Sequence, residues 1–456
     1  MANDTIAAIA TARGVAALAI IRISGPNAID IAGSCFSGAD LAKAPSHTVH
    51  VGSFEGIGGQ DVDQVVVTVF RSPRSVTGED VVEVSCHGGD FTQQEVLRSL
   101  LDRGARLALP GEFTQRAFLN GKIDLAQAEA VADLIHAHSS LAQRVSLAQL
   151  HGRYSRHIEE VRAKLLETCS LIELELDFSE EDVEFADRER LARLLDETSE
   201  FLQRLLGSAH LGTLIRDGVR VVIGGRPNAG KSTLLNALLG TDRAIVSDIP
   251  GTTRDEIEAE TEIEGLRFRF VDTAGLREAS DVIEAEGVKR THRAIERSQM
   301  LLYVHDVTKG LDEGERRFLD EMARRHPELV VIRVGNKSDL SMNGAARSED
   351  DLKISALQAQ HEPDALSELR DILVERARGG VSESDASQIV TNERHRQHLQ
   401  RAADAIRDAR AHIDSASGDV LSIDLRQALN ELGSITGEVT TEDILGEIFS
   451  RFCIGK

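Results

Sequence analysis

The feature that most constrains this chain is a glycine-rich octapeptide that follows a short apolar run. Residues 219–223 read as a buried strand, and residues 225–232, G-R-P-N-A-G-K-S, fit the pattern G-x-x-x-x-G-K-[ST]. A helix is expected to start at Thr233. Glycines let the backbone and a helix N-terminus surround phosphate groups, while Lys231 supplies positive charge and Ser232 can bind Mg²⁺. The octapeptide therefore predicts a nucleotide-binding α/β domain.

The next strand end supplies an acidic residue that suits the same site. Residues 266–270 alternate apolar and polar side chains and lead into Asp272-Thr273-Ala274-Gly275. An acid at a strand end can hold a water molecule of the metal, and Gly275 can lie close to the γ-phosphate. The sequence D-T-A-G alone is a common turn, so its value comes from following the octapeptide.

A third segment indicates guanine as the base. The apolar run 330–334 leads into Asn336-Lys337-Ser338-Asp339. The Asp339 carboxylate can accept two N–H bonds from a guanine edge that adenine lacks. Ser355-Ala356 is typical of the last base-contacting loop, although Leu357 stands where GTPases usually have lysine. The sequence thus favours GTP over ATP.

Composition restricts the classes of partner and compartment. Acidic residues outnumber basic ones by 75 to 52, which gives a net charge of -23 and argues against a chain that holds nucleic acid mainly by counterion release. The N-terminus shows no targeting signal, and no apolar stretch is long enough to cross a bilayer, so we expect a cytoplasmic protein. The four cysteines lie far apart and suggest neither a disulfide framework nor a zinc module: Cys35, Cys86, Cys169 and Cys453.

Composition shifts divide the 456 residues into four segments. Short β-branched runs between glycine and proline clusters predict a small sheet domain in residues 1–118. Apolar residues at helical spacing predict long helices in residues 119–215 and 380–456, and a helix is preferred over a strand at 173–178. Strand, turn and helix units in residues 216–379 predict a parallel sheet covered by helices. The expected fold class is α/β plus α, with the α/β domain inserted between two halves of one helical domain.

Taken in order, these motifs resemble those of the Ras-like GTPase superfamily, with Gly251-Thr252-Thr253-Arg254 as the second motif. The resemblance implies that Thr253 joins Ser232 on Mg²⁺ and that residues 244–254 form a switch ordered by the γ-phosphate. The residues that it places at the nucleotide are Asn228, Ala229, Gly230, Lys231, Ser232, Thr233, Ser247, Asp248, Ile249, Pro250, Gly251, Thr252, Thr253, Asp272, Thr273, Ala274, Gly275, Asn336, Lys337, Ser338, Asp339, Ser355 and Ala356.

Two positions depart from the Ras pattern. Leu276 stands where Ras-type enzymes have the glutamine that orients the attacking water, and a leucine cannot do this. The nearest replacement lies in the acidic stretch 278–286, which is otherwise simply a solvated face. Asn228 can offer its side-chain oxygen to a monovalent cation beside the phosphates, or it can be a turn-forming residue after Pro227.

Together with the flanking segments, both departures resemble the MnmE (TrmE) family of tRNA modification GTPases along essentially the whole chain. The segments that carry the resemblance are 110–125, 225–232, 244–255, 272–278 and the terminal Phe452-Cys453-Ile454-Gly455-Lys456. The family implies a homodimer whose GTPase domains meet across their nucleotide faces with potassium bound, and a switch glutamate, here Glu284, that positions water. The implied potassium contacts are Asn228, Ser247, Ile249 and Thr252.

The resemblance also implies that the N-terminal domain binds 5-formyltetrahydrofolate or a related formyl or methylene derivative. The matching positions are Arg22, Glu83, Lys122 and Lys456, with Glu79 as a rival for Glu83. A carboxylate can accept the adjacent N–H groups of a pterin, and cations suit the folate carboxylates. Taken without the resemblance, these are ordinary surface charges.

Cys453, four residues from the end, has two interpretations. It is a candidate catalytic nucleophile if its thiolate is stabilised, or a small apolar residue that closes a pocket. A prenylation signal is a poor fit, because glycine and lysine follow where such signals need other residues.

The function that the family implies is modification of tRNA. A potassium-activated GTPase would act with the flavoprotein MnmG (GidA) to install a carboxymethylaminomethyl-type group at carbon 5 of the wobble uridine of certain tRNAs. The alternatives are a ribosome-assembly GTPase of the Era type and an interaction GTPase of low turnover. Five arginines between residues 394 and 412 could contact RNA phosphates or form a solvated helical face.

Overall fold

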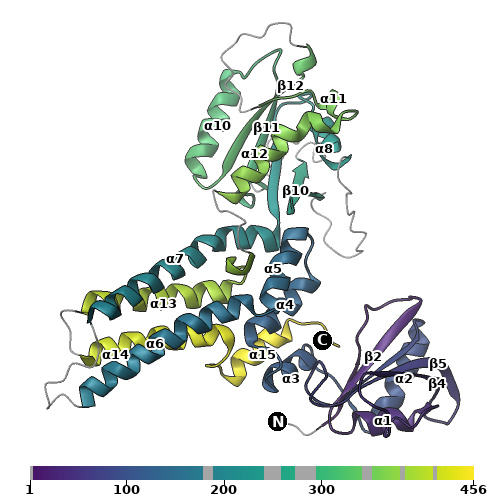
Figure 1. Ribbon diagram of the computed structural model, residues 1–456. Coiled ribbons are helices and arrows are strands. Elements are labelled where there is room, and N and C mark those ends of the chain that lie inside the picture. The colour runs from purple at the N-terminus through teal and green to yellow at the C-terminus, as the bar shows by residue number, and fades with distance from the viewer. Residues whose placement is uncertain are drawn as a thin grey trace. The chain divides into compact units, whose positions relative to one another are not determined.

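The structure is a computed structural model that describes residues 4–177, 188–240, 258–272, 294–340, 352–379, 386–413 and 418–455. Figure 1 labels its helices and strands. The chain divides into two compact units, each built from segments that are far apart in sequence. Residues 1–132, 149–191 and 412–456 form unit 1, and residues 133–148 and 192–411 form unit 2.

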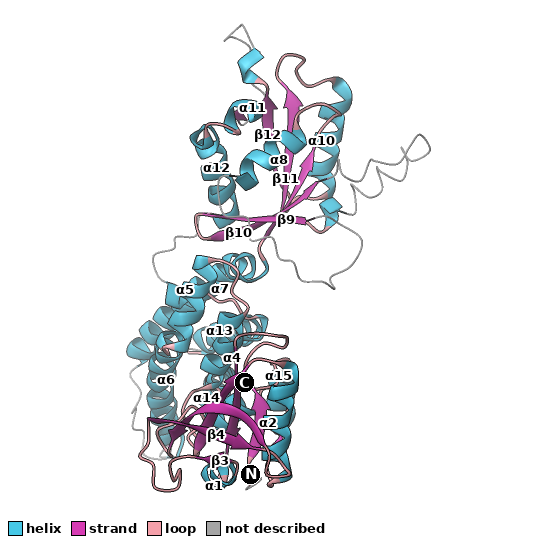
Figure 2. Ribbon diagram, turned by 90° about the vertical axis from the view of Figure 1, so that its right-hand side faces the viewer, coloured by secondary structure: helices cyan, strands magenta, loops and turns pink. Residues whose placement is uncertain are grey.

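Unit 1 contains a seven-stranded sheet with the order β3-β4-β5-β6-β2-β1-β7 (Figure 2). Alternation explains its buried face: Val65, Val67 and Val69 of β5 point inward and pack with two helices, α1 (Ala28–Ser34) and α2 (Asp90–Asp102). The small sheet domain expected from the sequence is confirmed. Its strands are β1 (Ile6–Ile9), β2 (Leu18–Ser24), β3 (Phe36–Ser37), β4 (Thr48–Glu55), β5 (Asp61–Phe70), β6 (Val81–His87) and β7 (Arg106–Leu107).

The proline-free segments are helical, as expected. The preference for a helix at 173–178 is confirmed through Asp177, the last residue of α6. His136 and His138, within the segment 119–215 expected to form long helices, lie in the turn after α4, because the Ser139 hydroxyl caps a new helix by accepting the Ala142 amide at 3.2 Å. These helices are α3 (Glu112–Leu119), α4 (Leu125–Ile135), α5 (Ser140–Leu150), α6 (Arg153–Asp177), α7 (Arg188–Asp217), α13 (Glu393–His412), α14 (Gly418–Thr436) and α15 (Glu442–Ser450).

Unit 2 contains a six-stranded sheet with the order β13-β12-β11-β8-β10-β9. All neighbours pair in parallel except β9, which forms an antiparallel hairpin with β10. The strands are β8 (Val219–Gly224), β9 (Glu258–Ile263), β10 (Leu266–Asp272), β11 (Met300–Asp306), β12 (Val330–Asn336) and β13 (Leu352–Lys353). The helices are α8 (Lys231–Gly240), α10 (Glu313–Arg325), α11 (Ala356–Ala359) and α12 (Ser367–Arg378).

Parallel pairing brings the functional ends of the strands together. Asp272 is in register with Ile223, one residue before the end of β8, and Asp306 is in register with Asn336. The carboxyl ends of β8, β10, β11 and β12 therefore meet at one edge of the sheet, where α/β folds bind their ligands.

The α/β domain is closed at its base by α7 and the segment that follows the domain. The Ser208 hydroxyl donates to the Gln388 carbonyl at 2.9 Å and accepts the Val390 amide at 3.1 Å. Gly212 lies so close to this segment that a Cβ atom there would be 1.9 Å from the Val390 carbonyl oxygen. The chain segments just before and just after residues 216–379 are thus fastened to one another.

None of the helices in the described part of the chain combines the length and the apolar character needed to span a membrane.

Candidate nucleotide-binding site

The loop between β8 and α8 requires glycine at two positions. Gly225 has φ 135°, and a Cβ atom there would lie 2.0 Å from the Val304 carbonyl oxygen. Gly230 has φ 93°, and its Cβ would lie 2.1 Å from the Asn336 amide nitrogen. Both clashes involve groups that are themselves held in place, so packing as well as backbone conformation selects glycine.

Lys231 is folded over this loop. Its ammonium group donates to the carbonyls of Gly225 at 2.9 Å and Arg226 at 2.8 Å, and the side chain is 7% exposed. Helix α8 starts at Lys231, two residues earlier than the predicted Thr233, because the Leu234 amide already donates to the Gly230 carbonyl. Lys231, the exposed Ser232 and the partly buried Thr233 therefore all lie in the first turn, where helix N–H groups favour anions.

Asn228 lies at the tip of the loop with φ 62° and an exposed side chain. This left-handed conformation agrees with the turn interpretation, since asparagine adopts it more readily than most residues. The side-chain amide also stays available to a ligand, because no other described residue forms a hydrogen bond with it. The conformation and the cation interpretation are compatible.

Asn336 connects the phosphate loop to the base-contacting loops. Its amide nitrogen donates to the Ala229 carbonyl at 2.8 Å, and its amide oxygen accepts the Ala356 N–H at 2.9 Å. The side chain is 2% exposed, so both bonds are shielded from water. One residue thus links the loop expected to hold phosphate to the loop expected to contact the base.

Asp339 is the residue that the sequence predicts will contact the base. It lies in a short 3-10 turn, Ser338–Leu340, with its side chain exposed. The Ser338 amide donates to the Ile354 carbonyl at 3.0 Å, and the Ser355 hydroxyl caps α11. The two base-contacting loops expected from sequence therefore lie side by side.

Lys337 has an ion-pair partner that the sequence alone did not predict. The Lys337 ammonium donates to Asp306 at 2.7 Å, at the end of the neighbouring strand. Burial raises the pKa of Asp306, but the hydrogen bonds from Lys337 and Thr308 outweigh it and lower that pKa from 3.8 to about 2. The position of an acid at the carboxyl end of a buried parallel strand was the available signal.

Arg226 links the phosphate loop to α10. Its guanidinium pairs with Asp312 and lies 3.6 Å from the Glu315 carboxylate. Asp312 and Glu315 form the capping box of α10, and Tyr303 donates to Glu315 at 3.0 Å. Burial, followed by the charge of Glu315, raises the pKa of Tyr303, so the phenol stays a donor. This network spans too much sequence for spacing to reveal it.

Several expected site residues lie outside the described residues, and of Asp272 only the backbone, at the end of β10, is described. The expected residues outside the described ranges are Ser247, Asp248, Ile249, Pro250, Gly251, Thr252, Thr253, Thr273, Ala274, Gly275, Glu284 and Lys456.

The positions expected to hold a folate lie in unit 1. Arg22 pairs with Glu83 across β2 and β6 at 2.7 Å, with both side chains 22% exposed. Lys122 is exposed, and its ammonium donates to the Pro73 carbonyl at 3.0 Å. Glu79 instead accepts Arg116 at 3.2 Å and the Ser24 hydroxyl at 2.8 Å.

The C-terminal segment packs against the first strand of the same sheet. A Cβ atom at Gly455 would lie 2.3 Å from the Ile9 carbonyl oxygen, and the Cys453 carbonyl accepts the Gly111 amide at 3.3 Å. Ile9 follows Ala8, the cross-strand neighbour of Arg22. Cys453 is exposed, unlike the three other cysteines, which are buried.

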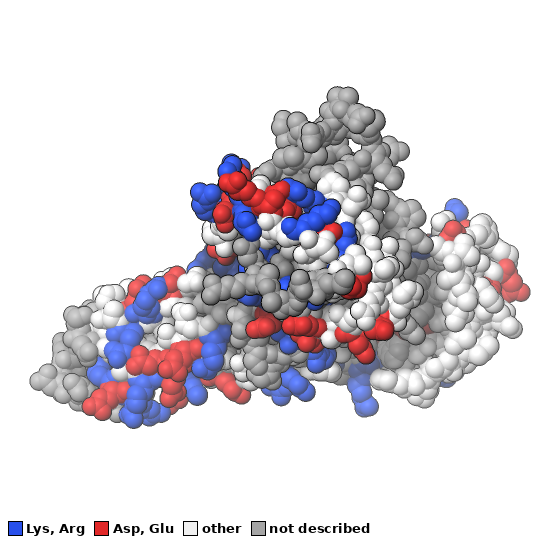
Figure 3. All heavy atoms as spheres, turned by 90° about the horizontal axis from the view of Figure 1, so that it is seen from above, with Lys and Arg blue, Asp and Glu red and all other residues white. Residues whose placement is uncertain are grey.

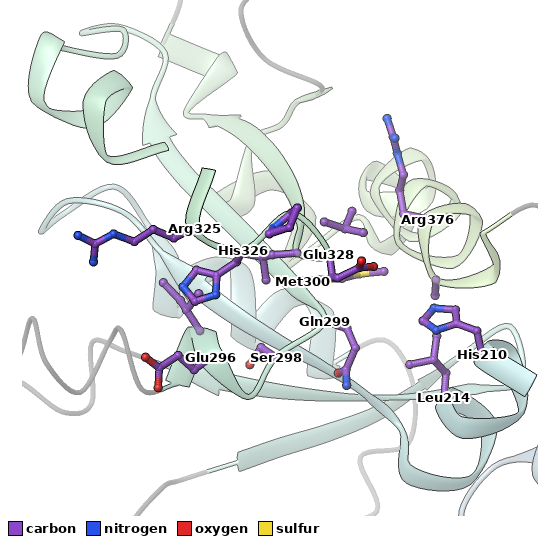
Figure 4. A pocket seen from close by; sticks show the side chains of 15 residues that line it. His210, Leu214, Glu296, Ser298, Gln299, Met300, Arg325, His326, Glu328 and Arg376 are labelled. Carbon is purple, nitrogen blue, oxygen red and sulfur yellow. The ribbon is translucent and has the colours of Figure 1, made fainter. Parts of the chain in front are cut away.

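A pocket of about 350 Å³ lies elsewhere in unit 2 (Figure 4). Its lining includes Met300 and Val330, which begin β11 and β12, whereas the nucleotide site lies where those strands end. The pocket is therefore separate from the nucleotide site.

In Figure 3, Lys and Arg side chains lie among Asp and Glu side chains on part of the face that is seen, while another part is largely uncharged. Helix α13 shows the same pattern, because three of its arginines pair with acids: Arg396 with Glu393, Arg407 with Asp404 and Arg410 with Asp196. These three ion pairs agree with the interpretation of α13 as a helix with a solvated, charged face.

Comparison with known proteins agrees with the sequence motifs. The family model for the MnmE helical domain matches residues 125–453, and that for the GTP-binding protein TrmE N-terminus matches residues 5–122. The tRNA modification GTPase MnmE of Salinibacter ruber is 59% identical over 100% of this chain and 99% of its own length. The protein of the same name from Cytophaga hutchinsonii is 48% identical over 100% and 98%.

Among solved structures, Era in complex with MgGDPNP and nucleotides of 16S ribosomal RNA is 27% identical over 41% of this chain and 66% of that chain. The TM-score is 0.28, so this similarity carries no argument about the fold. The two family models and the full-length relatives confirm the family expected from the motifs. The chain is a GTP-hydrolysing enzyme, and it belongs to the MnmE (TrmE) family of tRNA modification GTPases.

Proposed function

We propose that this chain is a potassium-activated GTPase that acts with an MnmG-type flavoprotein on tRNA in the cytoplasm. The product is a carboxymethylaminomethyl-type group at carbon 5 of the wobble uridine. One observation supports the GTPase part most directly: Asn336 joins the phosphate loop to the loop that presents Asp339. The chain matches the two tRNA modification GTPases named above along nearly their whole length, which supports the tRNA part of the proposal.

The experiment that tests this function is mass spectrometry of nucleosides from total tRNA of the source cell, with and without the chain. Loss of aminomethyl-type wobble uridines supports the proposal. Unchanged tRNA together with accumulating ribosomal precursor particles would instead identify an assembly GTPase. A variant that no longer selects guanine, Asp339→Asn, should reproduce the loss, because it removes the carboxylate that accepts the guanine N–H groups.

We assign nucleotide and metal roles as the family suggests. Ser232 and Thr253 would bind Mg²⁺, which neutralises charge that develops on the phosphates, and Glu284 would position the attacking water. Asn228, with Ser247, Ile249 and Thr252, would hold K⁺ beside the phosphates. The exposed Asn228 amide in its left-handed conformation fits such a ligand.

The potassium role predicts faster GTP hydrolysis in KCl than in NaCl, lost in Asn228→Ala. Alanine also strains a backbone at φ 62°, so Asn228→Gly is the better variant, because it removes the side-chain amide without straining the backbone. Both variants should hydrolyse GTP at the same rate in the two salts. Equal rates in both salts for the unchanged protein would exclude the proposal.

We propose that the folate site uses Arg22, Glu83, Lys122 and Lys456, with Cys453 as a candidate for the later chemistry. Glu83 is preferred to Glu79 because Glu79 already accepts Arg116 and Ser24, whereas Arg22 pairs with one oxygen of Glu83, Oε1. The docked C-terminal segment, next to the strand that pairs with Arg22, supports Lys456 as a fourth member.

Titration calorimetry with 5-formyltetrahydrofolate tests this choice. Glu83→Gln should weaken binding roughly tenfold or more, because an amide supplies one acceptor where the pterin needs two. Glu79→Gln is the matched control and should bind nearly as well as the unchanged protein. If Glu79→Gln weakens binding and Glu83→Gln does not, the assignment is reversed.

The remaining parts of the proposal concern assembly. We propose a homodimer whose GTPase domains meet when GTP is bound, and a four-part division at residues 118, 215 and 379. The inserted position of the α/β domain, closed at its base by Ser208 and Gly212, supports a GTPase domain that acts as one piece.

A further inference from the structure

The first turn of α5 is attached to the hairpin formed by β9 and β10. The Ser140 hydroxyl donates to Glu262 at 2.7 Å, and the Ser140 amide donates to the other oxygen of the same carboxylate at 3.2 Å. The Leu141 amide donates to the Gly265 carbonyl at 3.2 Å. Glu262 thus places a negative charge at the N-terminus of a helix that lies far from it in sequence, which is a favourable arrangement.

The contact is packed as well as hydrogen-bonded. Leu141 and Val145 are each 1% exposed and belong to the same apolar core as Phe268 of β10. Gly265, at the hairpin turn, has φ 85°, and a Cβ atom there would lie 3.2 Å from the Ser140 hydroxyl and 3.3 Å from the Leu141 Cβ. The turn therefore fits α5 only without a side chain.

The hairpin occupies a special place in the GTPase. In sequence it lies between the segment 244–254 and the segment that begins at Thr273, the two segments expected to respond to the γ-phosphate. Strand β10 ends at Asp272 and pairs with β8 up to Ile223, directly before the phosphate loop. In sequence, the hairpin therefore joins the two segments expected to respond to the γ-phosphate, and its turn is fastened to α5.

We propose that Ser140, Leu141 and Glu262 are positioning residues that couple the nucleotide state to α5. They hold the β9–β10 hairpin so that Asp272, at the end of β10, lies at the nucleotide site. A displacement of the hairpin is transmitted through them to the first turn of α5. Through α5, the nucleotide state acts on the helical segment 119–215.

Two measurements on the full-length protein test the coupling. Amide hydrogen exchange of residues 140–148 is compared with GDP bound and with a non-hydrolysable GTP analogue bound. The unchanged protein should show different protection in the two states, and Glu262→Ala should lose this difference. In steady-state kinetics Glu262→Ala should lower kcat roughly tenfold while KM for GTP changes less than about twofold, since a displaced group costs rate more than binding.

The matched control is Glu260→Ala, the same substitution on the same strand. Glu260 pairs with Arg267 and Arg269, within the hairpin. It should keep the nucleotide-dependent exchange of α5. Glu262→Gln retains an acceptor for Ser140 and should restore at least half of the lost kcat.

Ser140→Ala guards against a folding defect, because it removes a single hydroxyl and should show the same loss of coupling in weaker form. The double variant Ser140→Ala with Glu262→Ala should be no slower than Glu262→Ala alone, since both act on one contact. The proposal is overturned if α5 exchanges equally in both states of the unchanged protein, or if Glu260→Ala and Glu262→Ala have equal effects.

Discussion

At the scale of single residues, Asn336 is a structural link between two loops as well as a member of a sequence motif. Its two hydrogen bonds, to Ala229 and Ala356, hold two loops that are otherwise separate in sequence. Burial makes each bond hard to replace, because water cannot reach the groups that would be left unpaired.

We therefore expect Asn336→Ala to weaken GDP binding at least about tenfold and to lower the free energy of unfolding by about 1–3 kcal/mol. Fluorescent nucleotide titration and chemical denaturation measure the two effects. Asn336→Asp keeps an acceptor for the Ala356 amide but sets a buried carboxylate oxygen against the Ala229 carbonyl, so it should lower the free energy of unfolding at least as much as Asn336→Ala. Unchanged affinity in Asn336→Ala would show that the loops hold their own positions.

The pair formed by Asp306 and Lys337 predicts a pH dependence. The pKa of Asp306 is lowered from 3.8 to about 2 in the folded protein, so its charged form stabilises the fold above about pH 4. That contribution, about 2 kcal/mol, is lost as the pH falls through the range from 4 to 2. Asp306→Asn should lower the free energy of unfolding by this amount at pH 7, and the difference from the unchanged protein should shrink below pH 4. A difference independent of pH would contradict it.

The sequence indicated the motif residues but not their partners. Asn336, Lys337 and Asp339 follow a buried strand, and strand pairing then dictates where they lie. Asp306 and the contacts of Arg226 depend on neighbours brought together only by the sheet order, which no local pattern contains.

At the scale of elements, α10 owes its start to a reciprocal cap. Asp312 accepts the Glu315 amide at 2.9 Å, and Glu315 accepts the Asp312 amide at 2.9 Å. Because Asp312 also pairs with Arg226, the start of this helix and the phosphate loop share one carboxylate.

Two substitutions separate these roles. Asp312→Ala removes both and should lower the free energy of unfolding by about 1 kcal/mol, the usual value of an N-cap. Asp312→Ser keeps a capping oxygen and loses the charge, so its stability should be close to that of the unchanged protein, because exposed ion pairs add little. Urea denaturation distinguishes the variants. Equal losses in both would mean that the ion pair, not the cap, carries the stability.

Element boundaries were the weaker part of the sequence interpretation. The periodicity of apolar residues indicates long helices and buried strands. It also predicted the helix at 173–177, although apolar and polar residues alternate there as in a strand. The start of α8 was misplaced by two residues, because the hydrogen bond from the Leu234 amide to the Gly230 carbonyl sets it. The two-residue strands β7 and β13 exist only through their pairing with β1 and β12.

At the scale of the whole molecule, the base of the inserted domain depends on Gly212. A methyl group there would meet the Val390 carbonyl at 1.9 Å, and neither backbone can move without parting α7 from the segment beside it. The grouping of residues 133–148 and 192–411 into one unit could not be predicted, because composition does not show which helix face meets which neighbour.

We expect Gly212→Ala to lower the free energy of unfolding by at least about 2 kcal/mol. Gly207→Ala, five residues earlier in the same helix, is the control, since nothing lies within 4 Å of the added Cβ. It should stabilise the protein by up to about 1 kcal/mol through helix propensity. Scanning calorimetry should show the two midpoints moving in opposite directions. Two equal shifts would show that α7 tolerates the methyl group.

The contacts of Ser208 and Gly212 with the segment 388–390 bring the two ends of residues 216–379 close together, which has a consequence for evolution. A module whose two ends meet can be gained, lost or exchanged in a single genetic event without disturbing the host into which it is set. We therefore expect residues 216–379 and the helices on either side of them to tolerate substitutions independently of one another.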